Sequence, residues 1–397
     1  MFIIINSGSS SLKFKVFDNI EGKTTIAEGL AERIGVDGKV VIKYQGQSIT
    51  AEIEMKNHEM AVKIILDQLL DLKIIKSYDE IKAIGSRVVH GGEEIKESVI
   101  IDEKVKDIIK KSVKLAPLHN PGALVAIQAF ENIVPKVLQV ASFDTSFHQT
   151  IAAEQYLYPV PNNWYEQHQV RKYGFHGISY QYICKYFAEI NQKKPQDLNL
   201  VICHLGNGSS VCCVKNGKSF DTTMGFTPLD GLMMGTRSGS VDPSIIEYMI
   251  KETKQDASKI TEMLNKQSGL LGVSEVSSDM RDITIAAEKG DKKAKIALEM
   301  YTQRVAQWIV QYLNNLDSKK IDGIIFTAGI GENSHVVRAK IIEKIKLIPL
   351  EIDDEKNIAP YSDFKKISKK GSSINIFAFR TDEEKMILND IKKYTKN

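Results

Sequence analysis

The chain carries the same strand-turn-strand pattern twice, and this repeat restricts its possible folds more than any other feature. Near the start, the apolar residues 3–5 lead into an Asn-Ser-Gly-Ser-Ser-Ser turn at 6–11 and a second apolar run at 12–17. Near the middle, the apolar residues 201–205 lead into Gly-Asn-Gly-Ser-Ser at 206–210 and another apolar run at 211–214. Each copy predicts a β-hairpin.

The composition of both turns suits the binding of an anion. Glycine lets a backbone approach a ligand closely, and such turns offer N–H groups and hydroxyls to phosphate oxygens. Either turn alone could be an ordinary hairpin. Because the pattern occurs twice, we expect a clamp around a polyphosphate.

Length and composition indicate a globular protein with two domains. The 397 residues are 43% hydrophobic and 26% charged, which is enough for two cores. Lys and Arg number 53 against 50 Asp and Glu, and they are spread along the chain, so no nucleic-acid partner is expected. No apolar run approaches the roughly 20 residues of a membrane helix, and the first residues lack a signal-peptide pattern. We therefore expect no membrane partner and a cytoplasmic protein.

Cysteines and histidines give little sign of a metal centre. The four cysteines show no C-x-x-C spacing and are expected to be buried thiols in a reducing compartment. Six of the eight histidines lie within residues 90–204, but no two are spaced like a helical pair of zinc ligands. Structural or substrate-contacting roles are favoured over zinc.

The first part of the chain has the pattern of an α/β domain with a mixed sheet, over residues 1–150. A closing helix at 381–397 is expected to complete it. The expected strands are 2–6, 12–17, 40–44, 48–54, 81–89 and 137–143, and the expected helices are 58–72 and 122–134. For the second of these helices, Asn120 is the expected cap and Pro121 the first residue.

The second part, residues 151–380, repeats the first in outline. The expected strands are 198–204, 211–215, 323–327 and 374–379, and the expected helices are 180–190, 243–252, 257–266, 291–316 and 336–345. The repeat predicts two related domains that face each other across a central cleft.

Two common nucleotide loops are absent. The glycine-rich turn at 326–333 follows a strand, but it lacks the third glycine of a dinucleotide fingerprint. Gly217-Lys218-Ser219 lacks the glycine that a phosphate loop needs five residues earlier. A nucleotide would have to be held in another way.

Two arginines are candidates for gripping an anion. Arg87 and Arg237 lie in polar segments flanked by glycines rather than on helical faces. A guanidinium can hold a carboxylate or a phosphoryl group through two parallel hydrogen bonds. The alternative is a surface role for each.

Polar residues near these arginines add candidates for chemistry. Asp144 directly follows a buried-type strand, where α/β proteins place reactive residues, although it could equally cap the following turn. Among the histidines, His176 stands between a phenylalanine and a glycine before a helix and is the strongest candidate. For His119 and His148, functional and structural roles both remain open.

Residues 6–13 and the longer segment 220–239 together resemble the two signatures of the acetate and propionate kinase family, and matching segments run from Asn6 to Glu383. The resemblance implies an α/β fold of two domains with duplicated mixed-sheet cores, as in the sugar kinase, heat-shock chaperone and actin superfamily with its ribonuclease H-like architecture. It also implies a homodimer.

The family's activity is the reversible, direct in-line transfer of the ATP γ-phosphoryl group to acetate, giving acetyl phosphate and ADP. A short carboxylate is ionised at neutral pH and needs no general base, but it must be relieved of repulsion from the triphosphate. The resemblance assigns nucleotide binding to the second domain, residues 151–380, and catalysis to Arg87, His119, Asp144, His176 and Arg237. Asp144 is expected to hold Arg87 or the metal shell, or to contact the phosphoryl group transiently. The resemblance assigns the acid's site to Arg87 and to an apolar pocket of Val89, Leu118, Phe175 and Pro228.

The resemblance also implies ATP or ADP as co-substrate and Mg²⁺, or Mn²⁺, as cofactor. Asn6 and Glu383 match the metal positions, although the family's usual T-N-E-E reads Thr-Asp-Glu-Glu at 381–384 and so adds a carboxylate at Asp382. The implied nucleotide-binding residues are Ser9, Ser11, Lys13, His204, Leu205, Gly206, Asn207, Gly208, Asp279, Met280, Arg281, Thr327, Ala328, Gly329, Ile330 and Gly331.

Three other functions place different demands on the sequence. Propionate or butyrate kinase activity would differ only in pocket volume, and one methylene is worth about 1–3 kcal/mol. An actin- or chaperone-like ATPase would not need the clustered arginines and histidines of an anion site. A metal-dependent hydrolase lacks the ligand spacing.

Overall fold

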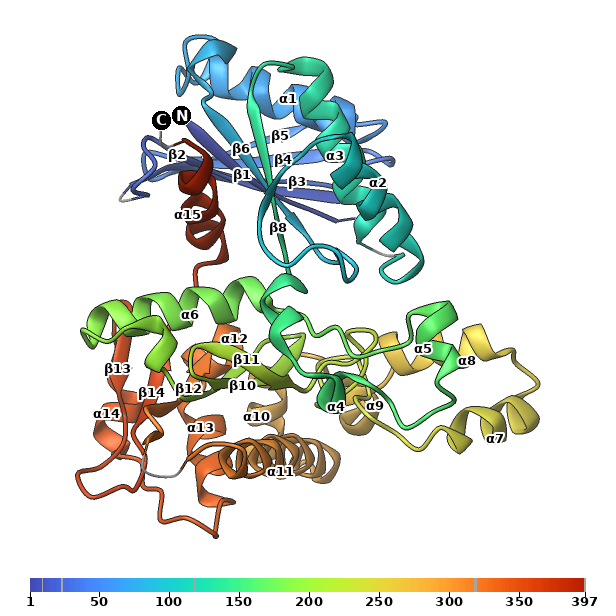
Figure 1. The fold of residues 1–397 in the computed structure, drawn as a ribbon, viewed down its shortest axis with the longest axis vertical. Coiled ribbons are helices and arrows are strands. Elements are labelled where there is room, and N and C mark those ends of the chain that lie inside the picture. The colour runs from blue at the N-terminus through green and yellow to red at the C-terminus, as the bar shows by residue number, and fades with distance from the viewer. Residues whose placement is uncertain (9, 23, 118, 318–319, 396–397) are drawn as a thin grey trace. The chain divides into compact units, whose positions relative to one another are not determined.

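The computed structural model describes residues 1–8, 10–22, 24–117, 119–317 and 320–395. Within it the chain forms two compact units (Figure 1). Unit 1 comprises Met1–Gln149, Gly177–Tyr182 and Asp382–Asn397, and unit 2 comprises Thr150–His176 and Ile183–Thr381. The candidate residues Ser9 and Leu118 lie outside the described residues.

Unit 1 is built on an eight-stranded mixed sheet in the order β5-β4-β3-β2-β1-β6-β8-β7. The strands β1, β6 and β8 run parallel, while β2 pairs antiparallel with β1. The strands are β1 (Phe2–Ser7), β2 (Ser11–Phe17), β3 (Thr25–Glu32), β4 (Lys39–Tyr44), β5 (Gln47–Glu52), β6 (Ala83–Val88), β7 (Val99–Ile100) and β8 (Leu138–Phe143).

Alternation along β1 distributes its side chains to two covered faces of this sheet. Ile3 and Ile5 join the apolar core that includes residues of α1 and α3. Ile4 points to the other face, where a Cβ on the neighbouring Gly85 would lie 2.5 Å from Ile387 of α15. Figure 1 shows α15 on one side of this sheet and α1 and α3 on the other. The helices of the unit are α1 (His58–Asp71), α2 (Glu103–Lys111), α3 (Asn120–Ile133) and α15 (Glu383–Thr395), with short 3₁₀ turns η1 (Tyr78–Glu80), η2 (Ser112–Lys114) and η3 (Ser146–Thr150).

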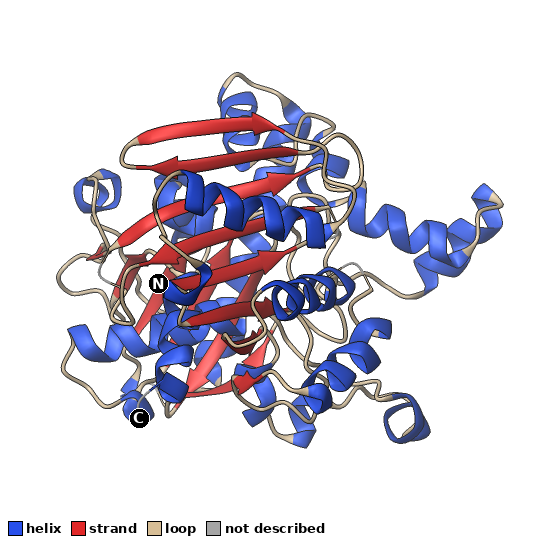
Figure 2. Cartoon of the chain, turned by 90° about the horizontal axis from the view of Figure 1, so that it is seen from above, coloured by secondary structure: helices blue, strands red, loops and turns tan. Residues whose placement is uncertain are grey.

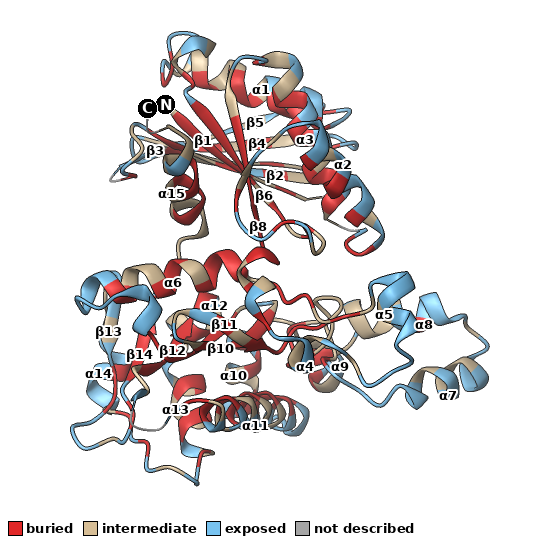
Figure 3. Cartoon of the chain, in the orientation of Figure 1, coloured by how far each residue is buried: buried red, intermediate tan, exposed pale blue. Residues whose placement is uncertain are grey.

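Unit 2 is built on a six-stranded mixed sheet in the order β11-β10-β9-β12-β14-β13. Its strands are β9 (Leu200–Leu205), β10 (Ser209–Lys215), β11 (Lys218–Thr222), β12 (Gly323–Thr327), β13 (Phe364–Lys366) and β14 (Ile376–Phe379). Strands β9, β12 and β14 are buried along their whole length (Figure 3). They read as continuous apolar runs because both faces of the sheet are covered.

Helices supply the two covering layers of unit 2, and Figure 2 shows the strands of the chain in red with helices in blue around them. The long helix α11 buries Tyr301, Val305 and Ile309 in one core with Val201 and Cys203 of β9. The helices are α4 (Ala153–Tyr156), α5 (Asn163–His168), α6 (Gly177–Ile190), of which Gly177–Tyr182 belong to unit 1, α7 (Ser244–Thr253), α8 (Ala257–Lys266), α9 (Gly269–Ser274), α10 (Met280–Glu288), α11 (Lys292–Asn314), α12 (Ala328–Asn333), α13 (His335–Glu343) and α14 (Asp354–Ile358), with the 3₁₀ turn η4 (Pro195–Asp197).

The two sheets share one topology. In each, a meander of three antiparallel strands (β3-β2-β1, and β11-β10-β9) is followed by two parallel strands and an antiparallel edge strand. Unit 1 adds only the hairpin of β4 and β5 at its far edge. The predictions of an α/β fold, of duplicated mixed-sheet cores and of a β-hairpin in both repeats are confirmed.

One detail of the sequence-based assignment is wrong. The position before α3 is taken by His119, while Asn120 is the first helical residue. The buried Asn120 side chain instead accepts a hydrogen bond from His90 N–H at 3.1 Å and donates to His90 O at 2.9 Å. It therefore holds the loop that follows β6. Among the described residues, the helices lack any stretch long and apolar enough to cross a membrane.

Candidate active site

In unit 1, the turn between β1 and β2 is held by two helices. Gly8 N–H donates to Ser11 O at 2.8 Å, which closes the turn. Ser7 Oγ donates to Gly122 O of α3 at 3.0 Å, and His58 Nε2 of α1 lies 2.8 Å from Gly8 O. A Cβ on Gly122 would approach Gly8 O to 2.6 Å, so glycine is needed there. Ser7 and Gly8, at the start of the candidate phosphate turn, are thus tied to α3 and α1.

Three candidate side chains start from adjacent positions of this sheet. Asn6 pairs in register with Lys13 on β2 and with Arg87 on β6. Asn6 and Arg87 stand near the carboxyl ends of parallel strands, where ligands of open α/β sheets bind. The first turn of α15 supplies Glu383 and Glu384 to the same region.

Arg87 is the centre of a partly buried charge network. Its Nε and Nη2 atoms donate to the two carboxylate oxygens of Asp144 at 3.0 and 2.7 Å, and its Nη1 lies 3.5 Å from Glu383 Oε2. Burial would lower the pKa of Arg87, but Asp144 and Glu383 outweigh it and raise the pKa. The network fixes the direction of the guanidinium.

The backbone positions Asp144 at the end of β8. Its N–H donates to Val88 O at 3.0 Å, and its carbonyl accepts from Gly177 N at 2.9 Å. Gly177 has to be glycine because a Cβ would lie 2.2 Å from Asp144 O. The buried Asp144 carboxylate thus binds Arg87. A role as a turn cap alone does not explain this pairing.

The two glutamates that begin α15 differ in their surroundings. Burial raises the pKa of Glu383, and Arg87 opposes this rise. Burial would also raise the pKa of Glu384, but Lys15 and Lys13 outweigh it and lower the pKa to about 2. Among the residues that the structure describes, no group of three or more His, Cys, Asp or Glu side chains is placed to hold a metal ion by itself.

In unit 2, the second hairpin places two histidines beside its turn. Leu205 pairs with Ser209, and Gly206 N–H donates to Gly208 O at 3.1 Å across the turn. The rings of His204 and His176 stack with centroids 4.0 Å apart. His176 Nδ1 lies 2.8 Å from the hydroxyl of Ser210 on β10.

His176 has a left-handed backbone conformation, with φ of 58°. This conformation is uncommon for a residue other than glycine and is frequent at functional sites. A Cβ placed on Gly208 would lie 3.5 Å from His176 Nε2 and 3.6 Å from Arg237 Nη1. The turn, His176 and Arg237 are therefore neighbours.

Arg237 is half-buried, and burial lowers its pKa. Its Nη1 donates to Pro228 O at 3.2 Å. Within the described part of the chain, no carboxylate lies within ion-pair distance of it, in contrast to Arg87. A half-buried guanidinium without a carboxylate is a ready site for an anionic ligand.

Three separate segments of unit 2 line one pocket of about 880 Å³. Seven candidate nucleotide-binding residues belong to its wall: Gly206, Asn207, Asp279, Met280, Arg281, Gly329 and Ile330. Six further candidates do not line it: His204 and Leu205 end β9, Gly208 lies in the turn after β9, Thr327 ends β12, and Ala328 and Gly331 lie in α12. The wall is completed by residues that are not candidates from the sequence, namely Ser278, Thr284, Ile285, Glu288 and residues 333–336.

Helix termini shape this pocket. Asp279 caps α10 by accepting from Arg281 N–H at 2.8 Å, and the Arg281 side chain lowers the pKa of Asp279 to about 2. Thr327 precedes α12, whose first residue Ala328 has φ of 63°. The third glycine-rich turn is thus the start of a short helix.

The apolar candidates for the acid's pocket fall in different units. Val89 directly follows β6 in unit 1 and is half-buried. In unit 2, Phe175 is buried and Pro228 accepts the hydrogen bond from Arg237. A common pocket formed by these residues therefore stays a prediction. The roles of His119 and of the other candidates also stay predictions.

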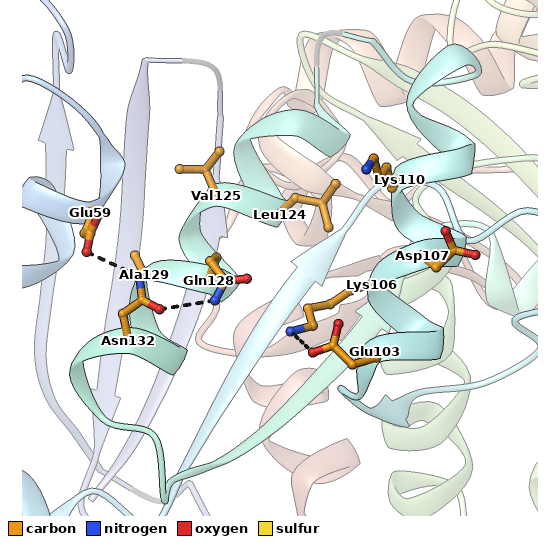
Figure 4. Close-up of a pocket in the computed structure, with 10 residues that line it drawn as sticks. All are labelled: Glu59, Glu103, Lys106, Asp107, Lys110, Leu124, Val125, Gln128, Ala129 and Asn132. Carbon is orange, nitrogen blue, oxygen red and sulfur yellow. Dashed lines mark hydrogen bonds and ion pairs between the residues drawn. The ribbon is translucent and has the colours of Figure 1, made fainter.

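A second pocket, of about 490 Å³, lies along α1, α2 and α3 of unit 1 (Figure 4). Its polar side chains largely bind one another: Lys106 contacts Glu103 at 2.5 Å, and Asn132 donates to Glu59 at 3.3 Å. No candidate residue lines it. It resembles a solvated helix surface more than a binding site.

Comparisons with known proteins agree with this geometry. The sequence matches the model of the Acetokinase family over residues 1–389. It is 56% identical to a protein of Mesoplasma florum named acetate kinase, over all of both chains. The fold is similar to the crystal structure of Porphyromonas gingivalis acetate kinase, with a TM-score of 0.94, 37% identity and coverage of 100% of this chain and 99% of that one. A propionate kinase from Francisella tularensis has a TM-score of 0.91 and 40% identity, with 98% of both chains covered.

The family match covers almost the whole chain, and one relative is more than half identical to it. No large segment therefore lies outside the match. The chain belongs to the acetokinase family.

Proposed function

We propose that the protein transfers the γ-phosphoryl group of ATP to acetate, forming acetyl phosphate and ADP, and catalyses the reverse reaction. The observation that carries the proposal is Arg237, a half-buried cation beside the Gly208 turn that lacks a carboxylate partner among the described residues. An acetate kinase needs such a cation because both of its substrates are anions.

The proposed chemistry is charge neutralisation and positioning. Acetate is ionised at neutral pH and can attack without a general base. Positive side chains would offset the negative charge on the phosphoryl oxygens. These are Arg87, whose direction is set by Asp144, and Arg237 together with His176. Transfer of a phosphoryl group depends mainly on such electrostatics and on in-line placement. His119 is proposed as a further contact.

The nucleotide is proposed to occupy the 880 Å³ pocket with its adenosine part, between Arg281 of α10 and Gly329 of α12. Phosphate contacts are proposed for the turn of Gly206, Asn207 and Gly208 in unit 2, and for the turn at 6–11 with Lys13 in unit 1. Both turns are rich in glycine, serine and asparagine, which are typical of turns that bind phosphate.

Mg²⁺ is proposed as the cofactor, held by Asn6 and Glu383. Mg²⁺ prefers oxygen ligands and is usually bound through one or two carboxylates, waters and substrate phosphates. The half-buried Glu383 carboxylate fits this donor set, and Mn²⁺ accepts the same ligands. The ion would neutralise charge on the phosphates.

The direct test is product formation from MgATP and acetate. We expect hydroxylamine to trap an acyl phosphate, and ADP to appear only when acetate is present. ADP release at the same rate without acetate would instead support an ATPase. No acyl phosphate from acetate, propionate or butyrate would exclude the proposal.

Propionate kinase activity is a second candidate, because the similar Francisella tularensis protein carries that name. The curated relative with higher identity is named acetate kinase, which favours acetate. Comparing kcat/KM for acids of two to four carbons decides between them.

We propose a homodimer in the cytoplasm. Exposed apolar side chains gather in two segments of unit 2, with Leu157, Val160 and Trp164 in one and Val241, Ile245 and Tyr248 in the other. Apolar surface of this kind is typical of an interface, and a second copy is its proposed cover. Four free, buried cysteines fit a reducing compartment. Light scattering of the purified protein tests the dimer.

A further inference from the structure

Lys15 on β2 is a half-buried cation to which the proposed reaction gives no role. It stands two residues after Lys13, so both side chains leave the same face of the strand. The Lys15 side chain is 17% exposed, whereas that of Lys13 is 54% exposed. Burying a charge is costly unless it is paired, so the position of Lys15 needs an explanation.

The partners of Lys15 are two carboxylates at the start of α15. Its Nζ lies 3.3 Å from Glu384 Oε2 and 3.6 Å from Asp382 Oδ1. Lys13 Nζ binds the other oxygen of Glu384, Oε1, at 2.8 Å. Glu384 therefore has one lysine on each oxygen.

Asp382 is the carboxylate that departs from the family's usual sequence. Its Oδ1 accepts from Lys385 N–H at 2.9 Å and so caps α15. An asparagine would cap about equally well, so capping does not require the charge. The charge of Asp382 is balanced by Lys15, which thus serves both carboxylates.

We propose that Lys13 exchanges between Glu384 and the phosphates of the nucleotide, and that Lys15 is the positioning residue that permits this exchange. The inference rests on the proposed role of Lys13 in binding nucleotide. When Lys13 turns to a phosphate, Glu384 keeps Lys15 on its second oxygen. Without Lys15, the same movement would leave Glu384, which is only 16% exposed, without a cation.

The consequence follows from the cost of stranding a charge. Removing one partner of a buried ion pair is far more costly than removing one from an exposed pair, because the remaining charge stays poorly solvated. Without Lys15, Lys13 would therefore be held back from the nucleotide.

The test is calorimetric titration of the full-length protein with ADP in the presence of EDTA, which removes any effect through the metal. We expect Lys15→Met to raise the Kd for ADP about five- to tenfold and Lys15→Arg to stay within about twofold of wild type. Glu384→Gln should lower the Kd, because it releases Lys13. This variant keeps the test decisive if Lys15→Met does not fold.

A matched pair of double variants separates the exchange from a general loss of positive charge. Lys15→Met with Glu384→Gln should restore ADP affinity. Lys15→Met with Asp382→Asn gives the same net charge but leaves Glu384 bound to Lys13. This pair should therefore recover less ADP affinity. Equal restoration by both pairs, or an unchanged Kd in Lys15→Met or in Glu384→Gln, would overturn the inference.

Lys13→Met distinguishes this inference from the proposed function. If Lys13→Met weakens ADP binding and Lys15→Met does not, only the exchange is wrong. If Lys13→Met leaves the Kd unchanged, the assignment of Lys13 to the nucleotide fails and the exchange fails with it, while acyl phosphate formation still tests the kinase activity.

Discussion

Arg87 and Asp144 face each other as a two-pronged pair, with Nε donating to Oδ1 at 3.0 Å and Nη2 donating to Oδ2 at 2.7 Å. Paired bonds of this kind fix the plane of the guanidinium as well as its place. Only Nη1 points elsewhere, toward Glu383 at 3.5 Å. Asp144 therefore determines how Arg87 can meet a substrate.

The first prediction concerns Asp144→Asn, which keeps the shape of the side chain and removes its charge. The amide loses one of the two strong bonds to Arg87, so we expect kcat to fall by about 10²-fold or more. Circular dichroism and ADP affinity should stay nearly normal. If Asp144 were only a turn cap, Asn would serve equally well and turnover would remain at the wild-type level.

The second prediction is that Arg87→Ala and Arg237→Ala each lower kcat by at least about 10²-fold, because each removes charge that counts most in the transition state. Lysine at either position should rescue only in part, since it lacks the planar fork. Arg33→Ala is the matched control, because Arg33 is 61% exposed and forms an exposed ion pair with Asp37. Near-normal turnover would place the substituted arginine outside the site.

The third prediction concerns Gly208→Ala. The fold has room for this methyl, since its nearest neighbours are His176 and Arg237 at 3.5 and 3.6 Å. The thermal midpoint should therefore change little, whereas kcat/KM for ATP should fall by about tenfold or more as the methyl takes space meant for phosphate. For comparison, Gly122→Ala should lower the midpoint, because its Cβ would lie 2.6 Å from Gly8 O. Unchanged kinetics in Gly208→Ala would remove this turn from the phosphate site.

The fourth prediction concerns the preference for the acid. Val89→Ala should enlarge the space beside the substrate methyl and shift kcat/KM toward propionate or butyrate, by at most about 1–3 kcal/mol per methylene. Val125→Ala, an exposed change on α3, is the control. A constant ratio of kcat/KM for acetate and propionate would show that Val89 does not line the pocket.

Elements with strong local signals could be predicted from the sequence. The helix expected at 257–266 and the strand expected at 323–327 match α8 and β12 without change. Strand β3 was missed because its burial is irregular, so it lacks the alternation of a half-buried strand. The short helices α2 and α10 were missed as well, because each offers little more than two turns of periodicity.

The candidate site likewise has features that the sequence predicted and features that it could not predict. The sequence marked Arg87 by its glycine-flanked polar segment, Asp144 by its place after a buried strand, and the two turns by their repeated composition. It left open whether Asp144 holds Arg87 or the metal shell, because 57 residues separate Asp144 from Arg87, and the structure shows that it binds Arg87. The sequence also gave no sign of Lys15, whose partners lie more than 360 residues away.

By itself, the sequence determined the duplicated α/β pattern, the hairpin turns and the family, because these depend on residues close together in the chain. The tertiary structure decided which charges are paired. It turned Arg87 onto a buried carboxylate, left Arg237 without one among the described residues, and placed two lysines on Glu384. The physical reason is that ion pairs depend on distances of 3 to 4 Å, which only the packing of strands and helices sets.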